Sequence, residues 1–297
     1  MIERFWQHVL ESEMAVPAEP PLNDLTAELV SMLGSLDSVE RHCIAYPVLA
    51  TWLSQGVYDD LLVTFGDGVA TGLNIGLGDV DSDRVFRRAL SASVLASCVT
   101  RDNAAHLLPI DAIVTWADSG LTWFVREQDL RGFVPHRGWA HAVAHGADLI
   151  GALARSRHFD VTELTVLLDV IADRLVAPTA YRLTHGEDDR LAYATMAILH
   201  RDALSPDLLE AWVGRLDATA NRLPPDDSGP ADEWPSAHVH NTRSFVRALY
   251  LQLAMGVHGH TGQDLAHFAT APAARADLLL ILRDALIPSL RFADRPG

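Results

Sequence analysis

Two histidines and an aspartate in the segment HRGWAHAVAHGADLIGALA, residues 136–154, have types and a spacing that can do chemistry. At 100° per residue on a helix, His141, His145 and Asp148 share one narrow stripe, which we call the histidine stripe, opposite an apolar stripe. Imidazole and carboxylate groups at this spacing suit a divalent metal ion, either zinc, iron or manganese. They can also act as a metal-free acid–base pair, or simply lie on a solvated or polar helix face.

Familiar catalytic motifs do not account for these residues. A zinc protease needs a glutamate directly after the first histidine of its H-E-x-x-H motif, and Ala142 stands there. The sequence has neither the His-Asp dipeptide of the helical phosphohydrolases nor a G-x-S-x-G elbow. Cys43 and Cys98 lie in no nucleophile motif, and they are too few and too scattered for a disulfide framework or a zinc knuckle.

Further polar residues stand at the start of two later helices. Glu187, Asp188 and Arg190 open one predicted helix, and Asn241 and Arg243 open another. If these helices stand side by side with the histidine stripe, imidazole, carboxylate, guanidinium and amide groups converge on one groove. The alternative is structural, since acids favour the first turn of a helix and arginines often pair between neighbouring helices.

The loop that leads into the histidine stripe adds three candidates for substrate binding. Asp129 and Arg131 in the sequence DLRG can hold a turn together by a carboxylate–guanidinium pair. Trp139 is expected to serve packing. All three are therefore expected to surround the site and support it.

The elements that must position these groups are helices. Apolar residues recur at helical spacing through most of the chain, and alternating strand-like runs are rare. Four apolar runs begin just after residues 84, 138, 190 and 243, a period of about 53 residues. Second helices are expected between them, near 107–123, 161–176 and 204–220.

This periodicity predicts an all-α fold, an α-solenoid of the HEAT kind built from helical hairpins that bury their apolar faces against one another. We expect one domain over 1–297, with an N-terminal helical pair at 22–55, repeated hairpins over 84–260 and a closing helix at 273–291. An irregular helical bundle is the alternative.

Three segments are expected to be loops. Residues 58–83 are rich in glycine, but their G-x-G-x-x-x-G pattern is one residue too long for a dinucleotide site. Residues 126–138 lead into the histidine stripe. Residues 221–241 are rich in proline and acid and are either a lid or a mobile surface insert.

Composition excludes several classes of function. The chain has no lysine, so all 23 basic residues are arginine, which excludes a pyridoxal phosphate aldimine and a P-loop nucleotide site. The net charge of −16 argues against nucleic acid and anionic membranes as partners. The sequence also has neither a signal-peptide pattern nor an apolar run long enough for a membrane span, so we expect a cytoplasmic protein.

The segments WLSQGVYDD, DRVFRRALSASVLA, DLRGFVPHRGWAHAVAHGADLI and GEDDRLAYA together resemble the bacterial domain-of-unknown-function family numbered 2785. The resemblance runs from about Trp52 to Tyr250, and GWAHAVAHGADL is its most specific part. It implies a helical array of about this length. It also implies a recurrent polar set, which maps here onto Asp129, Arg131, Trp139, His141, His145, Asp148, Glu187, Asp188, Arg190 and Asn241. It supplies no reaction.

Two functions of different classes follow. In the first, the protein is an enzyme, most naturally a hydrolase or lyase, that acts on a polar small molecule with or without a metal. The histidine stripe then supplies metal ligands or an acid–base pair, and Glu187 or Asp188 completes the ligands or acts as base. Arg190, Asn241 and Arg243 orient the substrate. In the second, a HEAT-like scaffold holds a peptide or protein partner in the same groove without chemistry.

Overall fold

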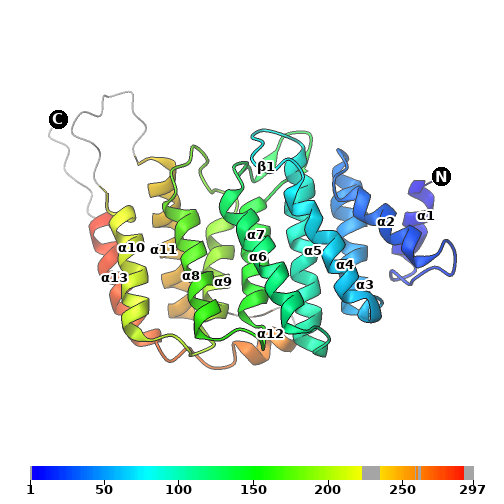
Figure 1. Ribbon diagram of the computed structural model, residues 1–297. Coiled ribbons are helices and arrows are strands. Elements are labelled where there is room, and N and C mark those ends of the chain that lie inside the picture. Colours follow the sequence, from blue (N-terminus) through cyan, green and yellow to red (C-terminus); the bar gives the residue numbers. More distant parts are fainter. Residues whose placement is uncertain (1, 223–234, 258, 260–261, 291–297) are drawn as a thin grey trace. The chain divides into compact units, whose positions relative to one another are not determined.

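Apolar residues at helical spacing become helices in most of the chain. The computed structural model describes residues 2–222, 235–257, 259 and 262–290. This described part is mainly α-helical and contains a single two-stranded sheet (Figure 1). The all-α class predicted from the sequence is confirmed. In the same described part, no helix is long and apolar enough to cross a membrane.

The chain divides into two compact units, Met1–His158 and Phe159–Gly297. The α-helices of the first unit are α1 (Ile2–Glu11), α2 (Leu22–Met32), α3 (Tyr46–Ser54), α4 (Leu62–Thr71), α5 (Arg84–Ala105), α6 (Ile110–Arg126) and α7 (Ala142–Ala154). Its shorter elements are the π-helix η1 (Glu40–Ala45), the 3-10 helices η2 (Asp59–Leu61) and η3 (Gly72–Asn74), and the strands β1 (Phe133–Val134) and β2 (Gly138–Trp139).

Within the first unit, α5 is the central helix. It packs on α3, α4 and most extensively on α7, while α6 packs on α4 and α7. Most of α5 is buried, because apolar and small residues from Ala89 to Val99 cover its middle turns. Four fully buried tryptophans, which lie in α1, α3 and α6, supply much of the remaining core: Trp6, Trp52, Trp116 and Trp123.

The glycine-rich segment 58–83 is not a continuous loop, contrary to the sequence-based expectation. It contains η2, α4 and η3, because apolar residues of α4 are buried at helical spacing. Gly66 serves close packing, since a Cβ atom there would lie 2.0 Å from Cζ2 of Trp116. The Trp116 Nε1–H donates to Asp67 Oδ1 at 2.8 Å, which joins α6 to α4. Gly66, Gly68 and Gly72 therefore belong to helices, whereas Gly76 and Gly78 lie in the turn that follows, with φ values of 62° and 97°.

The second unit is also helical. Its helices are α8 (Val161–Val176), α9 (Glu187–Leu199), α10 (Pro206–Ala220), α11 (Ala237–Met255), α12 (Gly262–His267) and α13 (Arg275–Leu290). Helix α9 packs mainly on α11, and α10 packs on α8 and α13. Asp160 and Glu163 form a capping box at the start of α8, and Ser205 caps α10 with Pro206 at its first position.

The predicted helix boundaries differ most from the structure at α7. The sequence pattern placed its start just after Gly138, but a β-hairpin occupies that stretch and α7 begins at Ala142. Helices α5, α7, α9 and α11 begin at residues 84, 142, 187 and 237, so their intervals vary around the predicted 53. The regular period and the single domain stay predictions.

Two further predictions fall partly outside the described residues. Most of the segment 221–241 lies there, and so does the last residue of the predicted closing helix 273–291.

Candidate functional site

A row of four rings runs from the hairpin into α7, and we call Phe133, Trp139, His141 and His145 the ring row. Phe133 and Trp139 face each other across the β1–β2 pair, edge to face, with centroids 4.9 Å apart. Trp139 stacks on His141 at 4.3 Å and 26°, and His141 meets His145 edge to face at 6.2 Å. Phe133 is 47% and Trp139 40% exposed, whereas the His145 side chain is only 12% exposed. The row therefore leads from solvent to a nearly buried imidazole.

His141 caps α7 instead of lying on its face, which corrects the helical placement assumed from the sequence. Its backbone is left-handed, with φ 52° and ψ 36°. Such a conformation is uncommon for a residue other than glycine and persists only where the surroundings impose it. Its N–H donates to the Arg131 carbonyl at 3.2 Å, and its own carbonyl accepts from the His145 N–H at 2.9 Å. Hairpin and helix thus fix this ring together.

His145 and Asp148 meet on the surface of α7, as their spacing predicted. Nδ1 of His145 lies 3.6 Å from Oδ2 of Asp148, and the Asp148 side chain is about one-third exposed. This distance suits an ion pair but is too long for a hydrogen bond, and His145 Nδ1 is buried without a hydrogen bond from the described residues. A small approach of the carboxylate would fix Nδ1–H and leave Nε2 as the proton acceptor.

His42, which the sequence did not single out, supports the ring row from η1. Its Nε2 lies 3.0 Å from the Trp139 carbonyl oxygen. Burial lowers the pKa of His42, as do the nearby Arg41 and His145, while the hydrogen bond to Trp139 opposes this change. The neutral ring therefore donates its Nε2–H to the carbonyl and holds the backbone of Trp139 in place.

The same half-buried ring predicts a loss of stability in mild acid. Because the pKa of His42 is lower in the folded than in the unfolded chain, the unfolded chain binds a proton that the folded chain rejects. The free energy of unfolding is then highest above about pH 6.5, the pKa of a histidine in the unfolded chain, and declines as the pH falls below it. The decline is at most about 1.4 kcal/mol for each unit by which the pKa differs between the folded and the unfolded chain. Urea unfolding between pH 7.5 and 5.5 measures this decline.

The matched variant for this prediction is His42→Gln, whose amide can still donate to the Trp139 carbonyl. It should reduce the loss of stability between pH 7.5 and 5.5, because glutamine does not titrate there. An unchanged pH dependence would contradict a role for His42. Burial also lowers the pKa of His200 in the second unit, so part of the decline should remain.

Arg41 anchors the hairpin from the same π-helix. Its guanidinium is fully buried, lies 3.9 Å from the centroid of the Phe86 ring, and donates to the carbonyls of Ser35 and Arg137. Neither Arg41 nor His42 carries a local sequence signal, because each acts on residues nearly a hundred positions away.

Asp129 and Arg131 form the ion pair that the sequence predicted. Nε and Nη2 of Arg131 donate to the two carboxylate oxygens of the fully buried Asp129, at 2.7 and 2.6 Å. Asp129 also accepts from the Ser82 N–H at 3.3 Å, and Arg131 donates to the Ser82 carbonyl at 3.1 Å. The pair therefore ties the loop before the hairpin to the segment before α5, which is a structural task.

The histidine stripe does not form a three-ligand metal site in this arrangement. Among the residues with described positions, no group of three or more histidine, cysteine, aspartate or glutamate side chains is placed to hold a metal ion. The displacement of His141 to the helix cap explains why the even stripe expected from the sequence is not formed. Metal binding by His141, His145 and Asp148 stays a prediction.

The predicted acids of the second unit lie at the start of α9. Glu187 is buried, accepts the His185 N–H at 2.7 Å, and lies 3.9 Å from the His185 ring. Asp188 is half-buried and Arg190 is exposed. Glu187 thus closes the turn that begins the helix, in agreement with the structural alternative for first-turn acids.

Asn241 and Arg243 also make contacts within the second unit. The Asn241 amide accepts from the Leu183 N–H and donates to the Tyr181 carbonyl, both at 2.9 Å, so it holds the segment before α9 against α11. Nε of Arg243 donates to the Ala220 carbonyl at 2.5 Å, and burial lowers the pKa of Arg243. The expected convergence of these residues with the histidine stripe stays a prediction, because the two sets belong to different units.

Comparison with known proteins identifies the family but no activity. No curated protein and no solved structure matches the chain. The family described as "Protein of unknown function (DUF2785)" matches residues 73–251, which include the whole hairpin, α7 and α9. This match covers more than half of the chain and agrees with the resemblance carried by the GWAHAVAHGADL block. The chain therefore belongs to the DUF2785 family.

Proposed function

We propose that the chain is an enzyme that acts on a small polar molecule at the ring row, with His145 as its general acid–base. The observation that carries this proposal is the contact of Asp148 with Nδ1 of a nearly buried imidazole, which adjoins an aromatic stack open to solvent. Buried histidine–carboxylate pairs recur where protons are moved. The reaction class that fits best is hydrolysis.

The residues divide this work between binding and proton transfer. Trp139, which is 40% exposed, offers an apolar ring surface against which a ring or planar group of the substrate can pack. A small approach of Asp148 keeps the proton of His145 on Nδ1 during the reaction, which leaves Nε2 to take a proton from water or to return one to a leaving group. His42 holds the backbone of Trp139 and so keeps the stacking surface at a fixed distance from His145.

An ester with a flat leaving group tests this proposal. We expect the purified protein to hydrolyse 4-nitrophenyl acetate faster than buffer. His145→Gln should lower kcat by roughly 100-fold, the lower end of the range for general acid–base groups, because the ester is not a native substrate. Asp148→Asn should lower kcat by a smaller factor than His145→Gln does. Trp139→Ala should raise KM, because it removes the stacking surface but no proton carrier.

His158→Gln is the matched control. His158 is another half-buried histidine of the first unit, and its Nε2 lies 3.2 Å from the Leu108 carbonyl oxygen, which glutamine can still reach. The kcat of His158→Gln for the ester should equal that of the wild type. Equal rates for His145→Gln and His158→Gln, or no hydrolysis above buffer by the wild type, would contradict the proposal.

We interpret the fold around this site as an array of helical hairpins of the HEAT kind. Within the first unit α3, α5 and α7 are successive neighbours, and α4 packs on α6, as expected of two parallel layers. In the second unit α9 packs on α11, and α8 on α10. Such arrays commonly hold partners along one face, which keeps a binding function as the second candidate.

One observation favours a peptide or protein partner. Leu36 and Val39 are 48% and 53% exposed on the segment that borders the hairpin, and Phe133 and Trp139 of the hairpin are exposed as well. A Cβ atom on Gly138 would lie 3.0 Å from that of Ser38, which shows how closely the two segments approach. Val39→Ser separates the candidates: it should leave ester hydrolysis unchanged but weaken a peptide complex on this surface.

A further inference from the structure

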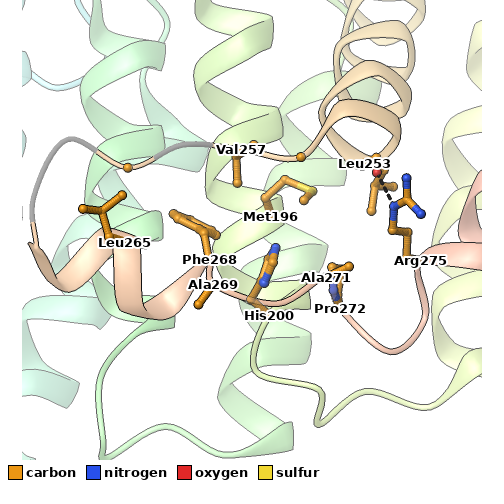
Figure 2. A pocket seen from close by; sticks show the side chains of 12 residues that line it. Met196, His200, Leu253, Val257, Leu265, Phe268, Ala269, Ala271, Pro272 and Arg275 are labelled. Atoms are coloured by element: carbon orange, nitrogen blue, oxygen red, sulfur yellow. Dashed lines mark hydrogen bonds between the residues drawn. The ribbon is translucent and has the colours of Figure 1, made fainter.

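The second unit contains a cavity that the proposed function does not use. It has a volume of about 320 Å³ and lies between α9, the end of α11, α12 and the segment that precedes α13 (Figure 2). This volume is at the lower end of the range for small-molecule sites and suits a compound with a single ring. Most of its wall is apolar, with Met196, Leu265, Phe268 and Pro272 around His200.

The His200 imidazole supplies an unused hydrogen-bond acceptor in this wall. Nε2 of the ring is buried and has no hydrogen-bond partner among the described residues. The backbone of Thr270 raises the pKa of His200, as a carbonyl near a ring N–H does, so we assign the ring proton to Nδ1. Burial nevertheless lowers the pKa of His200, so the ring is neutral at neutral pH and Nε2 carries a lone pair.

The neighbouring groups do not satisfy this acceptor. Arg275 donates to the carbonyls of Leu253 and Ala254, at 2.7 and 2.8 Å, at the end of α11. His267, whose ring centroid lies 5.9 Å from that of His200, points its Nε2 to the Ala197 carbonyl at 2.9 Å. Each polar neighbour thus has a backbone partner of its own, and Nε2 of His200 is left without a donor.

The walls beside His200 suit an aromatic ring. Phe268 meets the imidazole edge to face at 4.9 Å and 86°, so both rings already form one corner of an aromatic site. Figure 2 shows the Met196 side chain above the imidazole, between it and Val257. Methionine is unbranched and adapts its shape readily, so rotation of its side chain can open Nε2 to a ligand and pack the thioether on the ligand ring.

We propose that this cavity binds a small, mainly apolar single-ring compound that carries a hydroxyl or N–H donor, which bonds to Nε2 of His200 while the ring packs between Met196 and Phe268. The ligand restores a hydrogen bond to a buried acceptor, which explains why a donor is required. The site is separate from the ring row and does not depend on the function proposed there.

Phenol and anisole are the probes that test the donor requirement, because methylation removes the donor and keeps the ring. Dissociation constants from NMR titration of the full chain should favour phenol by about 3- to 10-fold, the range for one neutral hydrogen bond. The ¹⁵N resonance of His200 Nε2 should move with phenol and not with anisole. Equal affinities, an unmoved resonance, or no binding of either probe at tens of millimolar would overturn the proposal.

Two variants locate the probes. His200→Phe keeps a ring but removes the acceptor, so phenol and anisole should then bind with similar affinity. Leu265→Trp, at a cavity-lining residue that is 58% exposed, should fill the cavity and abolish binding of both probes. Its matched control is Leu251→Trp, at a residue of α11 that is 54% exposed and does not line the cavity. Phenol binding that survives Leu265→Trp would place the probe elsewhere and refute the site.

Discussion

Replacement of Glu127 by glutamine should lower the free energy of unfolding by about 3–5 kcal/mol, the usual cost of leaving one member of a buried ion pair without its partner. Arg88 and Glu127 are 0% and 2% exposed, and Nε and Nη2 of Arg88 reach the two carboxylate oxygens at 2.5 and 2.8 Å. Glutamine keeps the size of the side chain but removes the charge. It also replaces one acceptor oxygen by an amide nitrogen that faces a donor.

The rest of the network explains why the loss should be large. The carboxylate also accepts from the Trp123 Nε1–H at 2.9 Å and from the Asp129 N–H at 3.0 Å. Nη1 of Arg88 donates to the carbonyls of Ile75 and Gly76, at 3.0 and 2.8 Å. The pair therefore joins α5, the end of α6 and two loops, and both side chains are buried away from bulk solvent, which cannot screen the charge that is left.

Urea unfolding followed by circular dichroism measures this effect, with Asp169→Asn as the control. Asp169 pairs with Arg215 at 2.8 Å, but both side chains are about half exposed, so its loss should cost less than about 1 kcal/mol. Similar small losses for both variants would show that the Arg88–Glu127 pair contributes little more than a surface ion pair.

The sequence was informative where a residue acts through its own helix. The helical spacing predicted α8 at its observed bounds and placed α10 within two residues of its observed start. It also paired His145 with Asp148, because residues three apart on a helix are neighbours whatever the tertiary structure. Local periodicity is sufficient for such predictions.

Features that depend on distant segments were missed. The hairpin strands are two residues long, too short for an alternating pattern, so residues 126–138 were expected to be a loop and the helix was expected to begin directly after them. His42 and Arg41 act on the hairpin across nearly a hundred residues. In α4, the glycines suggested a loop, because the residue that requires Gly66, Trp116, lies much later in the sequence. Tertiary packing, and not local preference, decides these positions.

Alanine at Gly146 is the second change with a large expected effect, and it tests the same kind of contact where α6 meets α7. A Cβ atom on Gly146 would lie 2.1 Å from Cδ2 and 2.4 Å from Cε2 of Phe124, a ring that is 2% exposed. The ring cannot move away without displacing other core residues, so we expect a loss of about 1–3 kcal/mol in the free energy of unfolding. This loss appears despite the better helix propensity of alanine.

Gly214→Ala isolates the packing cost. Gly214 is an exposed helical residue of α10, and a Cβ atom there would meet no atom within 4 Å. Alanine should therefore stabilise the chain by about 0.5–1 kcal/mol, from helix propensity alone. The two glycine variants should differ in unfolding free energy by about 2–4 kcal/mol, with opposite signs relative to the wild type. If both variants stabilise the chain equally, α7 does not approach α6 as closely as Gly146 requires, and the position of the helix that carries His145 and Asp148 must differ accordingly.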